Sequence, residues 1–488
     1  MPSRGAWLSW LTADFPNATI AGLCIAAIAV AMFLDVLLQP ASVISDLAGT
    51  HIAVGNWIIA HHTVPRTDPF TWTMAGQPWQ ASEWLAELLI AFVYRVSGWG
   101  GLVLLAAVSM AATVLIVSWS AARRLVGIPL LIAVGLSVCN LDLIDAPRPH
   151  FLVLPLLASW VAGLLIARER DCAPPFWLAG LMVLWVNMHG SFIFGLFLTL
   201  PFALEAVIET SPSNRRRAAI QWGLFTGTSL FACLSNPYGF DALTYPFWLT
   251  SIKELAGFAE WSPLYQLPAL PKLNAFLGIL LGAALVLPLR VPPIRAAIII
   301  ALLVMTLAHI RHAPLLAMVA PMLLAGPIAK AIEQKQVIDW SNAVRVAMIV
   351  VFAVVAIFGG ARLAVPFERP ETPLWPVSAV RAVPPMIRSR HVYNEAATPG
   401  PYLIFMGIAP AFDDRVELFG DTVWPAAGPF DYRWLDENGV DWTIVVPESS
   451  LSEIQDHDPK WVRIYEDQFA VVHVRKSVWD AYKAGAKS

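Results

Sequence analysis

The sequence predicts a mainly α-helical, polytopic membrane helix bundle followed by a small C-terminal α/β domain. The 488 residues are 57% hydrophobic and only 14% charged, whereas soluble domains average about 25% charged residues. The apolar residues come in blocks of membrane-spanning length, and a span needs about 20 of them. After residue 366 this pattern gives way to short β-like and helical stretches that alternate, as in an α/β fold.

Eleven apolar segments are candidate membrane spans. They are residues 18–38, 101–122, 127–144, 150–167, 174–188, 190–210, 218–235, 272–289, 294–310, 313–330 and 343–364. The first is too long for a removed signal peptide and lacks a small-residue cleavage site, so we expect a retained span. Residues 83–97 are also apolar but include Arg95, and we expect either a helix at the membrane interface or a continuation of the next span.

Lysine and arginine set the predicted orientation, because they accumulate in cytoplasmic loops. With the N-terminus inside, every cytoplasmic loop of the eleven-span arrangement is basic. These loops contain Arg123, Arg124, Arg168, Arg170, Arg215, Arg216, Arg217, Arg290, Arg295, Lys330, Lys335 and Arg345. Counting 83–97 as a full span would place these clusters outside, so we expect eleven spans and an extracytoplasmic C-terminal domain.

The predicted domains are a transmembrane module of residues 1–365, with a large first outer loop of residues 39–100, and an outer α/β domain of residues 366–488. Their join, PFERPETPLWP, is rich in proline and predicts an extended linker. None of the four cysteines falls in the outer domain, so no disulfide framework is expected there. The predicted strands are Tyr402–Phe405, Trp442–Val446, Trp461–Tyr465 and Ala470–Val474, and the predicted helices are Tyr432–Glu437 and Ser450–Asp456.

Ionisable and amide side chains gather in the five outer loops. Polar groups near the hydrocarbon boundary are costly unless they are paired or face a wet cavity, so a ring of them predicts a cavity that opens outward. The candidate site residues are Asp46, His51, Asp68, Glu83, Arg148, His150, Asn187, His189, Asn236, Tyr238, Arg311 and His312. A carboxylate in such a cavity can act as a general base, and arginine can stabilise a developing phosphate charge.

The three acids of the first outer loop are candidate catalytic residues, and each also has a structural alternative. Asp46 is explained equally well as a helix cap. Asp68 lies in TDPF, where aspartate often accepts hydrogen bonds from its own backbone. Glu83 opens SEWLAE, a natural capping position. We prefer Asp46 as the base because it stands at the exit of the first span.

The cations of the later loops have alternatives too. Arg148, between two prolines, could pair with Asp145 and only lock its loop. Arg311 lies between His309 and His312, and three basic groups cannot satisfy one another, so a role in binding an anion is favoured. His309 and His312 are the one histidine pair with the spacing of metal ligands on a helix, and Arg311 interrupts this pair. We therefore expect no structural metal, and a divalent cation is the one cofactor left open.

In the order of its motifs, the chain resembles the GT-C superfamily of membrane glycosyltransferases, and more narrowly a broad group of uncharacterised bacterial membrane proteins. The likeness covers nearly the whole chain. The matching residues are Asp46, His51 and Gly55; Pro65, Asp68, Pro69 and Phe70; Gly76, Pro78 and Trp79; Glu83, Trp84 and Leu85; Arg148, Pro149 and His150; Asn187, His189 and Gly190; Asn236 to Gly239; and Arg311 to Pro314. One departure is that LAGT replaces the two tryptophans that usually precede the histidine, which leaves Asp46 one residue further from His51.

The resemblance implies inverting transfer of a sugar from a polyprenyl-phosphate donor to a hydroxyl of a glycan, lipid or protein. The reaction would take place on the periplasmic face of the bacterial inner membrane, with a first-loop carboxylate as base and the other candidate residues binding substrate. The expected partners include membrane lipid but not nucleic acid, because the chain has no basic stripe.

Three alternatives remain open at the level of the sequence. A polysaccharide polymerase or ligase would share the outward site and the lipid-linked substrate. A transporter or flippase would need polar residues at mid-membrane and often a repeat, whereas here the ionisable residues gather at one face and no repeat is evident. A non-enzymatic assembly protein would not need acids paired with cations in its outer loops.

Overall fold

The computed structural model describes residues 18–39, 48–141, 148–334, 340–395, 399–423 and 431–485. Asp46 and Asp145 lie outside these ranges. The chain forms two compact units, which we describe separately. The bundle unit comprises residues 1–43, 100–246 and 256–366, and the loop–sheet unit comprises residues 44–99, 247–255 and 367–488.

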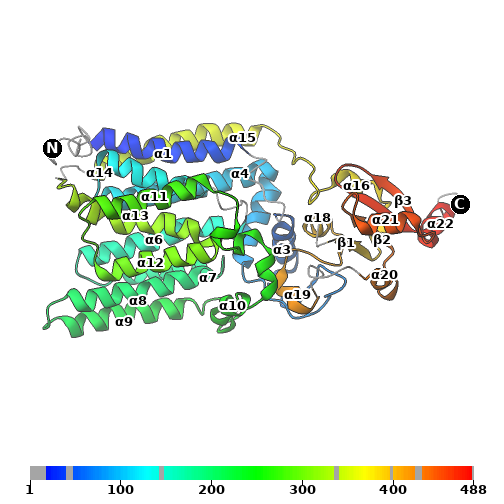
Figure 1. Ribbon diagram of the computed structural model, residues 1–488, viewed down its shortest axis with the longest axis horizontal. Helices are drawn as coiled ribbons and strands as arrows, with labels where there is room; N and C mark the ends of the chain where they lie inside the picture. The colour runs from blue at the N-terminus through cyan, green and yellow to red at the C-terminus, as the bar shows by residue number, and fades with distance from the viewer. Residues whose placement is uncertain are drawn as a thin grey trace. The chain divides into compact units, whose positions relative to one another are not determined.

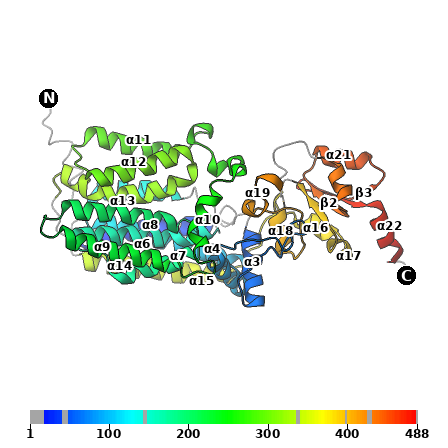
Figure 2. The same cartoon turned by 90° about the horizontal axis from the view of Figure 1, so that it is seen from below.

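All eleven apolar segments predicted as spans form helices. The helices are α1 (Ala18–Leu38), the second part of α4 (Trp84–Ala122), α5 (Gly127–Val138), α6 (Pro149–Glu169), η2 and α7 (Phe176–Ala179 and Gly180–Val186), α8 (Phe192–Glu209), α9 (Arg215–Ala232), α11 (Pro271–Val286), α12 (Pro293–Ala308), α13 (Ala313–Ala331), and α14 to α15 (Trp340–Val354 and Gly360–Ala364), joined by the π turn η7 (Val355–Gly359). Figure 1 shows α1 packed against α14 and α8 against α9, and Figure 2 shows α12 beside α13.

Within the described residues, five helical segments are long and apolar enough to cross a membrane by themselves: Trp84–Ala122, Pro149–Glu169, Phe192–Glu209, Ile310–Ala331 and Asn342–Ala364. Shorter apolar helical segments, of 10–17 residues, are Gly22–Leu38, Gly127–Val138, Phe176–Val186, Pro271–Val286 and Pro293–Ala308. The chain is therefore a multi-pass membrane protein, and the count of eleven spans stays a prediction.

An asparagine lies at or just after the end of two helices of the bundle, α5 and α7. The side-chain amide of Asn140 donates to the carbonyl of Leu136 at 2.8 Å, and that of Asn187 donates to the carbonyl of Val183 at 2.7 Å. Each amide thus satisfies one of the carbonyls that the last turn of a helix leaves without an intrahelical partner. α5 ends at Val138, with Cys139 as its C-cap.

α4 consists of two helices joined at Gly98. Gly98 has φ 57° and ψ −154°, a conformation that glycine adopts at low cost because it has no Cβ. The residues up to Trp99 belong to the loop–sheet unit, and those from Gly100 belong to the bundle unit. The predicted segment 83–97 is thus followed directly by the next apolar helix, but the break at Gly98 makes it a helix of its own within the loop–sheet unit.

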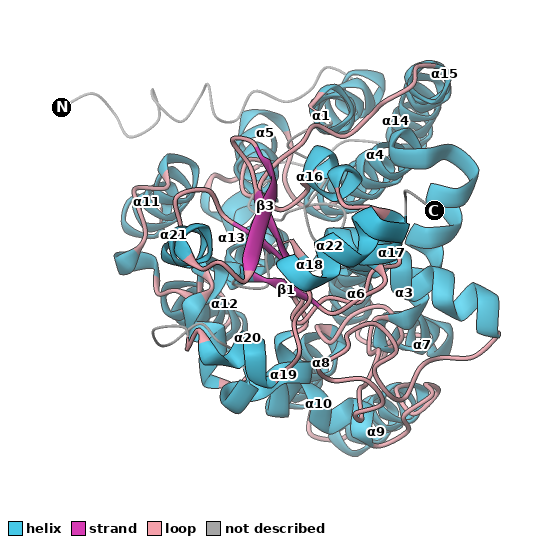
Figure 3. Cartoon of the chain, turned by 90° about the vertical axis from the view of Figure 1, so that its right-hand side faces the viewer, coloured by secondary structure: helices cyan, strands magenta, loops and turns pink. Residues whose placement is uncertain are grey.

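The loop–sheet unit contains a four-stranded sheet with the order β1-β2-β4-β3. The strands are β1 (Val392–Asn394), β2 (Trp442–Val445), β3 (Trp461–Glu466) and β4 (Val471–Arg475). β1 pairs parallel with β2, and the other neighbours pair antiparallel. Figure 3 shows the strands among the helices of this unit; α16 (Val377–Ala382) and α21 (Ser450–His457) contact β3, and α22 (Lys476–Gly485) contacts β3 and β4.

Three of the four predicted strands are present within one residue of their expected bounds, and the predicted helices correspond to α20 (Arg433–Glu437) and α21. The fourth prediction is wrong, because Tyr402–Phe405 belongs to the helix α18 (Gly400–Phe405). Pro401 stands at the start of α18, where its fixed φ favours a helix. A short apolar run cannot by its pattern distinguish a strand from a buried helix. β1 was not predicted.

Residues 48–99 of the first outer loop pack with the C-terminal residues in one unit, whereas the sequence predicts this loop as part of the transmembrane module. Their shared core includes Val54 and Trp79 from the loop and Phe412 and Trp461 from the C-terminal part. α3 (Ala48–His61) lies so close to α18 that a Cβ at Gly49 would meet the carbonyl oxygen of Pro401 at 2.4 Å. The remaining elements are α10 (Asp241–Leu249), η3 (Lys253–Gly257), η4 (Ala259–Trp261), η5 (Leu264–Gln266), η6 (Ile310–His312), α17 (Pro385–Arg388) and α19 (Val416–Val423).

Candidate functional site

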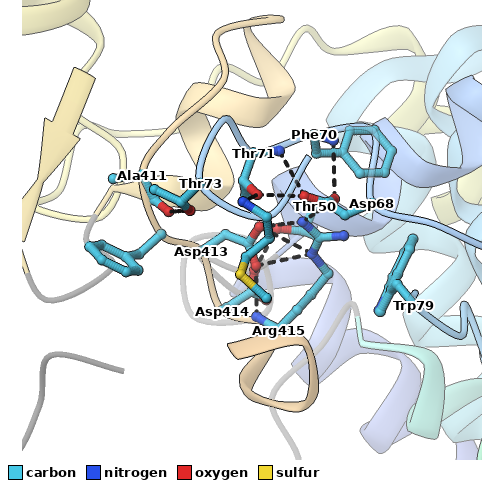
Figure 4. Close-up of polar contacts among 12 residues, drawn as sticks. Thr50, Asp68, Phe70, Thr71, Thr73, Trp79, Ala411, Asp413, Asp414 and Arg415 are labelled. Atoms are coloured by element: carbon cyan, nitrogen blue, oxygen red, sulfur yellow. Dashed lines mark hydrogen bonds and ion pairs between the residues drawn. The ribbon is translucent and has the colours of Figure 1, made fainter. Parts of the chain in front are cut away.

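Arg415 lies at the centre of a buried ionic cluster in the loop–sheet unit (Figure 4). Its Nε and Nη2 donate to the two carboxylate oxygens of Asp413 at 3.0 and 2.5 Å, and Nη2 also lies 2.8 Å from Oδ1 of Asp68. The guanidinium faces the ring of Trp79 at 4.4 Å. Burial disfavours the charge on Arg415, but the carboxylates of Asp413 and Asp68 raise its pKa above the ordinary value. The cluster thus ties the first outer loop to the C-terminal part.

Asp68 has the contacts expected of the structural alternative. Its carboxylate is buried and accepts hydrogen bonds from the backbone N–H groups of Phe70 and Thr71, each at 3.0 Å, and from the hydroxyl of Thr71. Together with Arg415, these donors use both of its oxygens. The geometry therefore explains Asp68 as the residue that fixes the TDPF turn, and a role as base is a proposal that this geometry does not favour.

A second pair of acids lies beside α3. Asp414 accepts a hydrogen bond of 2.6 Å from the hydroxyl of Thr50. Nδ1 of His51 lies 3.2 Å from Oε1 of Glu87. Burial and the neighbouring Asp413 raise the pKa of Asp414 to about 6, against the opposing effects of His51 and Thr50. This carboxyl group changes its protonation close to neutral pH, which is the range that suits proton transfer.

Sequence reasoning missed these acids, although signals for them were present. Asp413, Asp414 and Arg415 form an acid–acid–arginine run in the C-terminal domain. Glu87 follows Glu83 by four residues, which places both on the same side of one helical start. Glu83 itself precedes α4, and its carbonyl accepts the N–H of Glu87 at 3.0 Å, as expected of a residue at a helix N-terminus.

The later outer loops bring two arginines to one glutamate in the bundle unit. Nη1 of Arg148 lies 2.9 Å from Oε2 of Glu260, and Nη1 of Arg311 lies 3.7 Å from Oε1 of the same residue. The guanidinium of Arg311 also covers the ring of Trp261 at 4.0 Å. The neighbours of Arg311 in the sequence are the basic residues His309 and His312, and the structure supplies an acid from another loop. The alternative partner of Arg148, Asp145, lies outside the described residues.

Local folding explains this convergence. Arg148 immediately precedes α6, whose first residue is Pro149, and Arg311 lies in the short helix η6. The turn that carries Glu260 is held against η6 by two hydrogen bonds. The N–H of Ile310 donates to the carbonyl of Ser262 at 3.2 Å, and Nδ1 of His309 donates to the carbonyl of Trp261 at 2.6 Å.

Three candidate histidines of the bundle unit lie near aromatic or polar partners. The rings of His150 and His189 are 5.8 Å apart, and Nδ1 of His189 lies 2.8 Å from the hydroxyl of Ser191. His312 contacts the ring of Phe194 edge to face, with centroids 5.7 Å apart. In the described part of the chain, no group of three or more histidine, cysteine, aspartate and glutamate side chains is arranged to hold a metal ion.

The side chains of the two candidate asparagines form hydrogen bonds with nearby backbone groups. Besides its contact with α7, the amide of Asn187 donates to the carbonyl of Ser235 at 2.8 Å and so joins the ends of α7 and α9. The amide of Asn236 donates to the carbonyl of Cys233 at 2.7 Å, and its oxygen accepts the N–H of Tyr238 at 2.7 Å. These contacts fix the loop in which Tyr238 lies.

The opposite end of the bundle unit carries a different ionic network. Oε1 of Glu205, near the end of α8, lies 2.7 Å from Nη2 of Arg295 at the start of α12 and 3.2 Å from Nε of Arg168 at the end of α6. Arg148 and Arg168 flank the two ends of α6. Arg148 and the network of Arg168 therefore lie at opposite ends of α6.

The comparisons with known proteins bear on the fold. No protein-family model matches the sequence, and no curated protein does. The chain is similar to the apo crystal structure of an oligosaccharyltransferase from Archaeoglobus fulgidus, with a TM-score of 0.51 and 11% identity over 87% of this chain and 69% of the other. It is also similar to the apo structure of ArnT from Cupriavidus metallidurans, with a TM-score of 0.50 and 12% identity over 92% and 97% of the two chains. The likeness to these two structures shows that this chain shares their overall fold.

Proposed function

We propose that this chain transfers a sugar from a polyprenyl-phosphate donor to a hydroxyl acceptor at the periplasmic face of the bacterial inner membrane. The observation that carries the proposal is the convergence of Arg148 and Arg311 on the carboxylate of Glu260. Guanidinium groups bind the oxygens of phosphates through paired hydrogen bonds, so two of them at one end of a membrane bundle suit a lipid-phosphate head group. The GT-C-like fold supports the same class of reaction.

In the proposed reaction the acceptor hydroxyl attacks the anomeric carbon as the bond to the phosphate oxygen breaks, with inversion. Arg148 and Arg311 stabilise the charge that develops on the leaving phosphate. A carboxylate takes the proton of the hydroxyl, and we assign this role to Asp46. Thr50 and His51, four and five residues further along the chain, lie beside the buried acids Asp414 and Glu87.

The proposal includes the partners and the location. The prenyl chain of the donor stays in the lipid, the acceptor is a hydroxyl on a glycan, a lipid or a protein, and the loop–sheet unit faces the periplasm. Transfer of a larger glycan is the second candidate, because one of the two similar structures is an oligosaccharyltransferase. A divalent cation is the one cofactor that the proposal leaves open.

The test of this function is turnover by the purified full-length protein with a panel of polyprenyl-phosphate sugars. General-base assistance contributes about a hundredfold to ten-thousandfold to a rate. Asp46→Asn keeps the size of the side chain but cannot accept the proton, so we expect a folded variant that loses at least about a hundredfold in turnover. The matched variants Asp68→Asn and Glu83→Gln should lower the Tm more than the turnover per folded molecule.

Two results would contradict the assignment of Asp46. One is an unchanged rate for Asp46→Asn. The other is a loss of turnover in Asp68→Asn at a wild-type Tm, which would identify Asp68 as the base.

A further inference from the structure

We propose that Glu260 is an internal ligand of the phosphate site, which occupies Arg148 and Arg311 until the phosphate of the donor displaces it. The inference rests on the proposed function and deepens it, because it identifies a residue that sets the affinity of the site for phosphate. It follows from the geometry of the three side chains, from their exposure and from their net charge.

The geometry shows one carboxylate divided between two cations. Oε2 of Glu260 lies 2.9 Å from Arg148, whereas Oε1 lies 3.7 Å from Arg311. The first distance is that of a good charge-assisted hydrogen bond, and the second is too long for one. Glu260 therefore binds Arg148 fully and Arg311 only in part. A phosphate, with more oxygens and a larger span, can reach both guanidinium groups at hydrogen-bonding distance.

The net charge of the three side chains and the hydrogen bonding of Arg148 also favour the binding of a stronger anion than a carboxylate. Two guanidinium cations face one carboxylate, so these three side chains carry a net positive charge. Nε of Arg148 is buried and has no hydrogen-bond partner within the described residues. Arg311 is held on the ring of Trp261, which orients the plane of its guanidinium. A phosphate would supply an acceptor oxygen for the buried Nε of Arg148, for which the described residues supply none.

Of the three side chains, that of Glu260 can most easily move away from its ionic contacts. Its side chain is 42% exposed, against 22% for Arg148 and 29% for Arg311. It lies in the middle of a three-residue turn, η4, and the backbone contacts of this turn with η6 do not involve the carboxylate. The side chain can therefore rotate into water while the turn and both arginines keep their places.

The ionic network at the other end of the bundle unit shows what a permanent pairing looks like. Glu205 is only 2% exposed, and Nε and Nη2 of Arg295 both reach its carboxylate, at 3.0 and 2.7 Å. Arg168 adds a further contact at 3.2 Å. Compared with Glu205, Glu260 has fewer and longer contacts and more exposure, as expected of an exchangeable ligand.

The experiment measures the Kd of farnesyl phosphate for the full-length protein and for Glu260→Gln. Glutamine has nearly the same size but no charge, so the variant loses the competitor and should bind farnesyl phosphate about three- to tenfold more tightly. Glu169→Gln is the matched control, because Glu169 is also shared by two arginines, Arg123 and Arg124. Its Kd should equal that of the wild type.

Two further ligands distinguish the source of the phosphate. Farnesol has the same tail without the phosphate, and the substitution at Glu260 should not change its binding. Inorganic phosphate should bind more weakly than farnesyl phosphate to both proteins. If inorganic phosphate binds as tightly as farnesyl phosphate and Glu260→Gln tightens both, Glu260 is an internal ligand of a free-phosphate site, and the proposed transfer function fails.

The opposite results overturn the inference. If the wild type binds farnesyl phosphate and Glu260→Gln binds it equally or more weakly, Glu260 is not a competitor, although the proposed function stands. If neither protein binds it, the phosphate site does not exist and both proposals fail. Should Glu260→Gln not fold, Glu260→Asp replaces it. Its shorter carboxylate bridges the arginines less well and should tighten binding, and weaker binding would overturn the inference.

Discussion

At the scale of single residues, Asp414 has a buried carboxyl group with a raised pKa. Burial and Asp413 raise its pKa to about 6 from an ordinary value of 3.8. The folded protein therefore holds more protons than the unfolded chain between these two pH values. The free energy of unfolding falls as the pH rises through this window, and the full unfavourable contribution is present above it.

This gives a prediction for Asp414→Asn. The amide oxygen still accepts the hydrogen bond of Thr50, but the side chain no longer ionises. We expect the variant to be more stable than the wild type at pH 8, by on the order of 3 kcal/mol, and the difference to become small towards about pH 4. Thermal unfolding measured from pH 4 to 8 tests this. A stability difference that does not change with pH would contradict the raised pKa.

Asp68 gives a second prediction at this scale. Asp68→Asn removes one of the two carboxylates that neutralise the buried Arg415. Breaking a buried pair in this way costs about 3–5 kcal/mol, so we expect a large fall in Tm. In the matched control, Asp431→Asn, the pair with Arg433 lies on the surface, and the Tm should not change. Equal Tm values for wild type and Asp68→Asn would refute the structural role of the cluster.

How far the sequence predicts these residues depends on the distance along the chain between partners. The turn at Asp68 was predictable because its backbone partners Phe70 and Thr71 are two and three residues away. The contact between Thr50 and Asp414 spans 364 residues, and the contact between Arg148 and Glu260 spans 112. Local patterns contain no information on such pairs.

At the scale of elements, Glu205 links three helices of the bundle unit. It lies in α8 and contacts Arg168 of α6 and Arg295 of α12. Such a contact supports the packing of α6, α8 and α12 at this end, because both cations are largely buried, with side-chain exposures of 4% and 16%.

The prediction at this scale compares two glutamates of α8. Glu205→Gln leaves two buried arginines without a carboxylate at that position, so we expect a Tm well below that of the wild type, with a loss of about 3–5 kcal/mol. Glu209 is 49% exposed and contacts only Arg168 among these cations, so Glu209→Gln should change the Tm little. Thermal unfolding in detergent measures both. The hypothesis fails if the two variants are equally stable.

Runs of apolar residues made the bundle helices predictable, since all eleven predicted segments form helices. The short elements were harder. The six residues of α18 and the three of β1 are too few for a period to be read, and packing in the core decides their conformation. The break in α4 depends on the positive φ of Gly98, which is one glycine among several in SGWGG.

At the scale of the whole molecule, the arrangement of charges predicts the topology. The loop between α8 and α9, which contains Ser213, should be cytoplasmic, and the loop–sheet unit should be outside. In a variant without the native cysteines, Ser213→Cys should resist a membrane-impermeant maleimide in intact cells and react after lysis. Glu453→Cys, on the exposed face of α21, should react in intact cells. Ready labelling of Ser213→Cys in intact cells would invert the topology.

The largest difference between prediction and structure also belongs to this scale. The order of the chain placed the first outer loop with the spans that flank it, but this loop packs with the C-terminal residues. The indole N–H of Trp72 donates to the carbonyl of Val392 at 2.9 Å, across 320 residues. The many tryptophans of the loop form the core that it shares with the sheet, which a sequence pattern alone does not assign.

The central claim is that two arginines of the bundle bind the phosphate of the donor during transfer. The most direct measurement is turnover of Arg311→Lys, Arg311→Ala and Arg148→Lys with a polyprenyl-phosphate sugar donor. Lysine keeps the charge but loses the planar pair of donors. We therefore expect each variant to fold with a wild-type Tm and to lose at least about tenfold in turnover. Wild-type rates for both Arg311→Lys and Arg311→Ala would contradict the claim.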